Sequence, residues 1–150
     1  MKLAIYNNDT IKQVALRREL AYLAFSENKL TEAQKEFEQI VPILRKIDTL
    51  RLTGALAILA QVYLKLGKID KAFEAGSECL LLAKKMQKSW NISSASFTLA
   101  QVEMHRKNYQ SAIAFARQAL EFYEKSDLQD ERINRINDII LEAQQKLTKK

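Results

Sequence analysis

Residues that interrupt helices, ligate metals or attack substrates are scarce in this sequence. Its 150 residues include three glycines, one proline, one cysteine and one histidine. Tight hairpin turns depend on glycine, proline or asparagine at fixed positions, so a fold built from β-hairpins is disfavoured. Ala, Leu, Glu, Lys and Gln, which are good helix formers, make up much of the remainder. The composition therefore predicts an all-α single domain.

The scarcity of Cys and His also argues against catalysis and metal binding. A structural zinc site takes about four Cys or His ligands, whereas this sequence offers only Cys79 and His105. Nucleophilic catalysis needs a nucleophile beside a base, and these two residues are far apart in the sequence. A glycine-rich phosphate-binding loop is missing as well. We expect no enzymatic activity, no metal and no cofactor.

Long uncharged apolar runs are also missing. The most apolar stretch, residues 50–66, contains Arg51 and Lys65, whereas a membrane-spanning helix needs about 18 predominantly apolar residues. The sequence does not open with a basic segment, an apolar core and a small-residue cleavage site. We therefore expect no membrane span and a cytoplasmic location.

Basic residues are in excess but do not form a nucleic-acid-binding strip. The net charge is +6, and +4 of it falls in residues 49–88, where seven Lys or Arg accompany three Asp or Glu. These basic residues fall at expected helix ends, where the helix macrodipole favours them, and stacking aromatics are not interleaved with them. Nucleic acid is thus disfavoured as a partner, and an acidic protein partner fits the modest excess.

What the sequence does contain is one block that recurs three times. A Leu-Ala pair is followed, twelve residues after its alanine, by another alanine, and the block recurs after 39 and then 40 residues. The three copies are Leu20-Ala21 with Ala33, Leu59-Ala60 with Ala72, and Leu99-Ala100 with Ala112. A fixed period of this size indicates a repeat array, in which each unit buries its apolar face against its neighbours.

Each copy predicts a helix, a short turn and a second helix. In the middle copy, Leu56, Leu59, Ala60 and Tyr63 share one helical face. The position just past this helix holds Asn28, Gly67 and Lys107 in the three copies; Asn and Gly tolerate the left-handed conformation of a helix end, and Lys does so poorly.

Other residues predict where the second helices begin and end. Thr31 with Gln34 resembles a capping box, and Asp70 is a good N-cap residue. Pro42 lacks a backbone donor, so we expect the helix that contains it to kink or stop early.

This pattern resembles the tetratricopeptide repeat family, in its long-helix variety with a period near forty residues. The resemblance covers residues 14–123, and the six alanines of the three blocks match the small residues at which paired helices touch in the family. It implies a right-handed superhelix of antiparallel helix pairs, with repeats at about 10–48, 49–88 and 89–126. It also implies a non-catalytic module whose first helices line a concave, peptide-binding side.

The two ends of the sequence depart from the repeat. Residues 2–6 align with residues 81–85, so we expect the chain to begin partway through a repeat, either as part of a longer array or with a short native turn. A C-terminal helix at about 127–148 carries an apolar stripe opposite a charged face. The stripe predicts either a cap on the array or a seam to a second copy, and it consists of Ile133, Ile136, Ile140, Ala143 and Leu147.

The face of the first helices beside the buried stripe is the candidate ligand groove. Side-chain amides in this row, Gln61 and Gln101, can bind the backbone donor and acceptor of a peptide together, and apolar neighbours can take its side chains. The alternative is that the aromatic members pack inside the array. The candidate groove consists of Arg18, Tyr22, Phe25, Ala57, Gln61, Leu64, Lys65, Phe97, Gln101, Met104 and His105.

These features of the sequence are compatible with three functions. A protein-binding or peptide-binding scaffold fits best. The alternatives are a peptide-sensing or inducer-sensing domain of a bacterial regulator and a self-association module that pairs through the C-terminal stripe or an uncapped N-terminal edge. Trp90 shares its repeat position with Ile11, so we expect it to pack between repeats.

Overall fold

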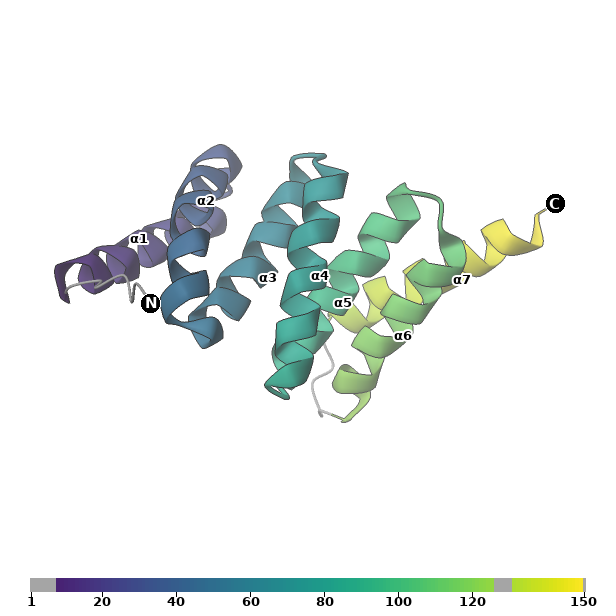
Figure 1. Cartoon of the computed structure of the whole chain (residues 1–150). Helices are drawn as coiled ribbons and strands as arrows, with labels where there is room; N and C mark the ends of the chain where they lie inside the picture. The colour runs from purple at the N-terminus through teal and green to yellow at the C-terminus, as the bar shows by residue number, and fades with distance from the viewer. Residues whose placement is uncertain (1–7, 126–130, 150) are drawn as a thin grey trace.

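The computed structural model describes residues 8–125 and 131–149, and within them the secondary structure is entirely helical. Consecutive helices run antiparallel and lie in a row, with α1 at one end and α7 at the other (Figure 1). Each helix packs on the next one along the chain, and α5 also contacts α3 and α7. The helices are α1 (Asn8–Ser26), α2 (Leu30–Ile47), α3 (Thr49–Lys65), α4 (Ile69–Lys85), α5 (Ser89–His105), α6 (Tyr109–Lys125) and α7 (Glu131–Thr148).

Small residues occupy the contacts between helices, as the sequence predicts. The six alanines of the repeated blocks are all fully buried. Gly76 of α4 lies so close to α5 that a Cβ atom placed on it would be 3.1 Å from Leu99 Cδ2. Small side chains let the helix axes approach, and this approach sets the spacing of the array.

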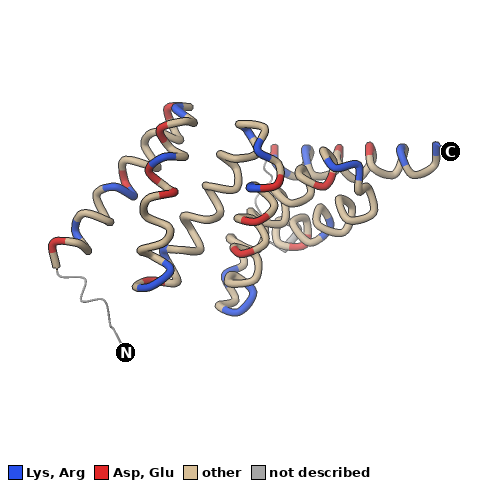
Figure 2. The backbone as a smooth tube through the Cα atoms, turned by 45° about the horizontal axis from the view of Figure 1, so that its top comes forward, with Lys and Arg blue, Asp and Glu red and all other residues tan. Residues whose placement is uncertain are grey.

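Charged residues follow the same division between core and surface. The tube of α3 is uncharged between Arg51 near its start and Lys65 at its end, while α1 and α2 carry both signs along their length (Figure 2). No helix in the described parts of the chain is long and apolar enough to cross a membrane.

The turns after the first helices use a left-handed residue in every copy. The φ angles are 60° at Asn28, 75° at Gly67 and 62° at Lys107. Lys107 thus adopts a conformation that lysine tolerates poorly. The backbone N–H of Asn108 donates to the Glu103 carbonyl at 2.9 Å, and the Asn108 side chain donates to the Glu103 carboxylate at 2.9 Å. These two bonds offset the roughly 1 kcal/mol cost of a left-handed residue.

The predicted caps of the second helices are wrong. Lys29 and Lys68 occupy the N-cap positions of α2 and α4, and neither makes a side-chain cap hydrogen bond. Asp70 lies instead in the first turn of α4, where it accepts a hydrogen bond from Arg106 at 2.7 Å. Tertiary pairing with the next repeat has taken the place of local capping.

The early stop expected at Pro42 is also wrong, because α2 continues to Ile47 with Pro42 inside it. The helix carries Leu44 beyond the proline, and Leu44 is 1% exposed. Burial of that side chain favours continuation of the helix although Pro42 donates no backbone hydrogen bond.

Asp48 is the side-chain cap that the structure does show. It precedes α3, and its carboxylate accepts a hydrogen bond from the Arg51 backbone N–H at 3.0 Å. This bond, followed by contributions from the Arg51 side chain and opposed by partial burial, lowers the pKa of Asp48 from its ordinary value of 3.8.

Removal of this cap gives a prediction for Asp48→Ala. We expect the free energy of unfolding to fall by about 1 kcal/mol at neutral pH, measured by urea denaturation. Because the folded-state pKa is lowered, this stabilisation is present above pH 3.8 and is lost as the pH falls through the folded value. The gap between parent and variant should therefore narrow in acid. Asp48→Asn, which keeps an acceptor oxygen, is the control and should lose less; an equal loss at all pH values would contradict the prediction.

Candidate functional site

The first helices of the three pairs share one pocket of about 470 Å³ with α7. We call it the first-helix pocket. Its walls come from the end of α1, the second half of α3, most of the length of α5, the end of α6 and the start of α7. It is lined by Phe25, Ile58, Gln61, Leu64, Lys65, Trp90, Ser94, Phe97, Thr98, Gln101, His105, Tyr123, Arg132 and Arg135.

The structure brings most of the candidate groove residues together at this pocket. The sequence register alone, with equal offsets of 39 and 40 residues, places them on one side of the array. The members that line the pocket are Phe25, Gln61, Leu64, Lys65, Phe97, Gln101 and His105. The members that do not line it are Arg18, Tyr22, Ala57 and Met104.

Core packing explains why two of these residues, Ala57 and Tyr22, lie outside the pocket. Ala57 is 5% exposed and belongs to the core. Tyr22 packs edge-on against Phe37 of α2, with ring centroids 5.5 Å apart. Burial, opposed by Arg18, raises the pKa of the Tyr22 hydroxyl. Met104 is half-buried on α5.

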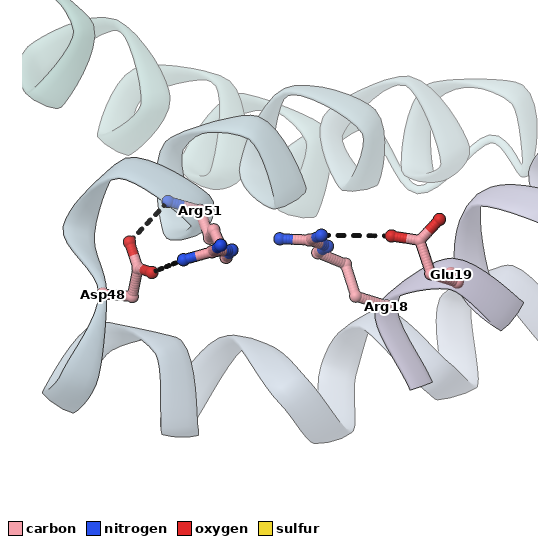
Figure 3. A network of polar contacts seen from close by, with 4 residues as sticks. All are labelled: Arg18, Glu19, Asp48 and Arg51. Atoms are coloured by element: carbon pink, nitrogen blue, oxygen red, sulfur yellow. Dashed lines mark hydrogen bonds and ion pairs between the residues drawn. The ribbon is translucent and has the colours of Figure 1, made fainter. Parts of the chain in front are cut away.

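Arg18 faces a different part of the molecule. Its guanidinium group points toward that of Arg51 (Figure 3). Arg18 pairs with Glu19 in the middle of α1, and Arg51 pairs with Asp48 at the start of α3. Arg18 and Arg51 line a separate pocket of about 50 Å³ between α1, α2 and α3. The position of Arg18 in the aligned row therefore did not predict its environment, because the end helix of an array has different neighbours from the inner ones.

The contribution of α7 to the pocket was not predicted from the sequence. Arg132 and Arg135 lie off the apolar stripe of α7, on the face expected to be solvated. In the structure, Ile136 and Ala143 of that stripe are buried, and α7 packs on both α6 and α5. This packing turns Arg132 and Arg135 toward the first-helix pocket.

Trp90 also corrects an expectation. It does not pack out of solvent between repeats, since it is 47% exposed and lines the pocket. Its ring meets Phe122 and Tyr123 edge-on, with centroids 5.9 and 6.3 Å away. Ile11 at the equivalent position of α1 is 48% exposed. The repeat position that Ile11 and Trp90 share is therefore a half-exposed site near the start of α1 and α5.

The positively charged side chains of the pocket lie over the faces of aromatic rings. Lys65 Nζ lies 5.0 Å from the centroid of Phe25, the Arg132 guanidinium 4.9 Å from Trp90, and the Arg135 guanidinium 5.3 Å from Phe97. Such contacts hold a cation in place over the face of the ring.

The pocket wall gives Lys65 and Arg135 no acidic counterpart among the residues that the structure describes. The described lining contains no Asp or Glu. Among the side chains that the structure describes, Lys65 and Arg135 form no ion pair. The pocket therefore presents cations, two side-chain amides and aromatic rings together, which suits an anionic ligand with an apolar part.

Metal ligation and cysteine chemistry find no support among the described residues. Among the described residues, no three His, Cys, Asp or Glu side chains gather where they could hold a metal ion. Cys79 is fully buried in the core, where its thiol donates to the Thr53 carbonyl at 3.4 Å. Burial raises the pKa of this thiol to about 12, so it is a core residue and a poor nucleophile.

Stacked antiparallel helix pairs joined by short turns define the chain as an α-helical repeat protein. Residues 50–125 match the family model described as "Tetratricopeptide repeat". The match covers half of the chain, and the chain belongs to the tetratricopeptide repeat family. The predicted all-α repeat superhelix is thereby confirmed.

Solved structures agree on the fold. The chain is similar to BtubC (BKLC) from P. vanneervenii, with 19% sequence identity and a TM-score of 0.70. The alignment covers 94% of this chain and 57% of BtubC, so the chain spans little more than half the length of that protein. A comparison with curated protein sequences gives no match. Tetratricopeptide repeats generally mediate protein–protein interactions and are typically non-catalytic.

Proposed function

We propose that this chain is a non-catalytic binding module that holds an acidic peptide segment of another protein in the first-helix pocket. The observation that carries the proposal is the charge of the pocket: Lys65, Arg132 and Arg135 line it, and its described lining has no acidic residue. A cleft of one sign attracts ligands of the other sign and raises their rate of association.

The remaining lining residues fit an extended peptide. Gln61 lies on α3, where its amide donates to Ser94 Oγ at 3.4 Å, and Gln101 lies at the equivalent place on α5. Each amide has a donor and an acceptor for a peptide backbone. The half-buried rings of Phe25 and Phe97 supply apolar surface beside the cations. The expected ligand therefore combines Asp or Glu with an apolar or aromatic side chain.

The test is selection from a library of random dodecapeptides displayed on phage, with the parent chain immobilised. We expect the selected peptides to be enriched in Asp and Glu and to change the fluorescence of Trp90, the sole tryptophan. The variant Lys65→Glu/Arg135→Glu should bind them at least about tenfold more weakly, since each lost charged contact is worth about 1–3 kcal/mol. Binding of the parent should weaken as salt is added.

A charge-matched control distinguishes an effect of the pocket residues from an effect of the net charge. Lys35→Glu/Arg117→Glu changes the total charge equally at two exposed positions on α2 and α6 that lie outside the pocket. It should bind within about twofold of the parent. Equal weakening by both double variants, or selected peptides without acidic bias, would refute the proposal.

A further inference from the structure

Two arginine side chains face one another at a small pocket that is separate from the first-helix pocket. Arg18 lies in the middle of α1 and Arg51 near the start of α3, and their guanidinium groups point toward each other (Figure 3). Both line the pocket of about 50 Å³ between α1, α2 and α3, which we call the arginine pocket. Like charges that face one another repel each other unless negative charge lies near them.

Most of the remaining wall of the arginine pocket is aliphatic. It consists of Ile11, Val14 and Ala15 of α1 and of Leu44 and Ile47 at the end of α2. Aliphatic side chains form no hydrogen bonds and lower the local polarity, which strengthens the attraction between a guanidinium group and an anion. The Arg18 side chain is 21% exposed and that of Arg51 is 57% exposed, so solvent and solutes reach the pocket on the Arg51 side.

The two carboxylates nearby do not use all the donors of the arginines. Asp48 also lines the pocket, and its carboxylate accepts hydrogen bonds from the backbone N–H and the side chain of Arg51. Glu19 lies outside the lining and accepts a hydrogen bond from Arg18 Nη2 at 3.0 Å, with its side chain 67% exposed. An exposed pair of this kind is weak, because water competes for both partners. The lining itself thus carries two cations and one carboxylate.

One donor of Arg18 has no acceptor. Arg18 Nε is the one buried side-chain nitrogen or oxygen among the described residues that has no hydrogen-bond partner. Buried N–H groups in folded proteins are nearly always paired, since an unpaired group loses its bonds to water without compensation. An anion bound beside Arg18 supplies the acceptor that the chain does not.

We propose that the arginine pocket binds a phosphate group, either free inorganic phosphate or the phosphate of a small monoester. The oxygens of a tetrahedral phosphate point in several directions, so one phosphate accepts hydrogen bonds from two guanidinium groups that face one another. A planar carboxylate fits a single guanidinium fork. The volume of about 50 Å³ suffices for a group of this size, since one water molecule needs about 10–15 Å³. The bound phosphate joins α1 to α3 through Arg18 and Arg51.

Heteronuclear NMR of the arginine side chains tests the site. We expect inorganic phosphate, added to the parent chain at neutral pH and constant ionic strength, to shift the Nε–Hε signals of Arg18 and Arg51 along one saturating curve. Arg18→Gln and Arg51→Gln each remove one signal, which assigns it, and should bind phosphate at least about tenfold more weakly. Arg117→Gln removes the same charge at an exposed position on α6. This matched control should bind phosphate within about twofold of the parent.

Two further ligands define the chemistry of the site. Glycerol phosphate distinguishes the two sources: tighter binding than inorganic phosphate assigns the site to a monoester, and weaker binding assigns it to the free ion. Acetate carries a planar carboxylate and should shift the signals of Arg18 and Arg51 much less at equal concentration. Equal binding of acetate and phosphate overturns the proposal.

The parent chain alone decides the outcome if a variant fails to fold, which circular dichroism detects. Signals of Arg18 and Arg51 that do not shift, or that shift without saturation, overturn the proposal. The variant Lys65→Glu/Arg135→Glu changes the first-helix pocket and should leave the phosphate-dependent shifts of Arg18 and Arg51 unchanged. Loss of these shifts in that variant places the phosphate in the first-helix pocket and also overturns the proposal. None of these results depends on peptide binding.

Discussion

Leu99→Ala is expected to lower the free energy of unfolding by about 3 kcal/mol, within the range of 2–5 kcal/mol for a buried leucine. Leu99 of α5 is fully buried, and its side chain packs against Gly76 of α4. Gly76 has no side chain that could move into the space left by the truncation. The lost dispersion contacts and the cavity therefore both contribute to the cost.

Urea denaturation followed by circular dichroism measures this effect. For a chain of this size, about 3 kcal/mol corresponds to a fall in Tm of about 6–12 °C. Leu81→Ala removes the same atoms from a position 56% exposed on α4, and it should cost less than about 1 kcal/mol. A loss below 1 kcal/mol for Leu99→Ala would show that α4 and α5 collapse into the cavity, contrary to the prediction.

The position of Leu99 explains why the sequence predicted the fold so well. The period of 39 and 40 residues places Leu20, Leu59 and Leu99 in one row, and Leu59 and Leu99 are buried as that row requires. Periodicity of this kind reports on contacts between neighbouring helices, which are the contacts that define a repeat array. Leu20 has the same place in the row and is exposed, because no helix of the described chain precedes α1 to cover it.

Helix boundaries were predicted less well because they depend on competing local and tertiary contacts. Asp70 has the side chain of a cap but bonds Arg106 of the next repeat instead. Pro42 has the backbone of a helix breaker but lies in a helix that is held on both sides of it by buried residues, Ile40 and Leu44. In both cases packing between elements outweighs a local preference worth about 1–3 kcal/mol.

The pocket could be predicted only in part, for a related reason. Equal offsets along α3 and α5 identify Gln61, Lys65, Gln101 and His105 as neighbours on one side. They do not show that α7, which departs from the period, brings Arg132 and Arg135 to the same place. The positive charge of the site is therefore a tertiary property. The excess of charge in residues 49–88 supplies only Lys65 to it, and Arg132 and Arg135 come from α7.

Gly76→Leu is expected to cost about 2–3 kcal/mol, because overpacking a closed core forces side chains and backbone to shift. A Cβ atom at this position would lie 3.1 and 3.2 Å from Leu99 Cδ2 and Cγ and 3.8 Å from Ala60 Cβ. The higher helix propensity of leucine, worth about 0.8 kcal/mol over glycine, does not offset this contact. Glu74→Leu adds the same side chain at an exposed position of α4 and should be close to neutral.

The double variant Gly76→Leu/Leu99→Ala distinguishes a packing effect from a general sensitivity of α4. It moves one leucine side chain from α5 to α4 and leaves the total volume at the contact nearly unchanged. We expect the double variant to lose less free energy of unfolding than the two single variants lose together, by at least about 1 kcal/mol. Residues in contact are coupled in this way. If the two losses in free energy of unfolding simply add, the two residues act independently, and the prediction that their contact matters is wrong. Because α5 also forms a wall of the first-helix pocket, a changed spacing between α4 and α5 should weaken peptide binding in the single variants. Peptide binding in the double variant should be closer to that of the parent.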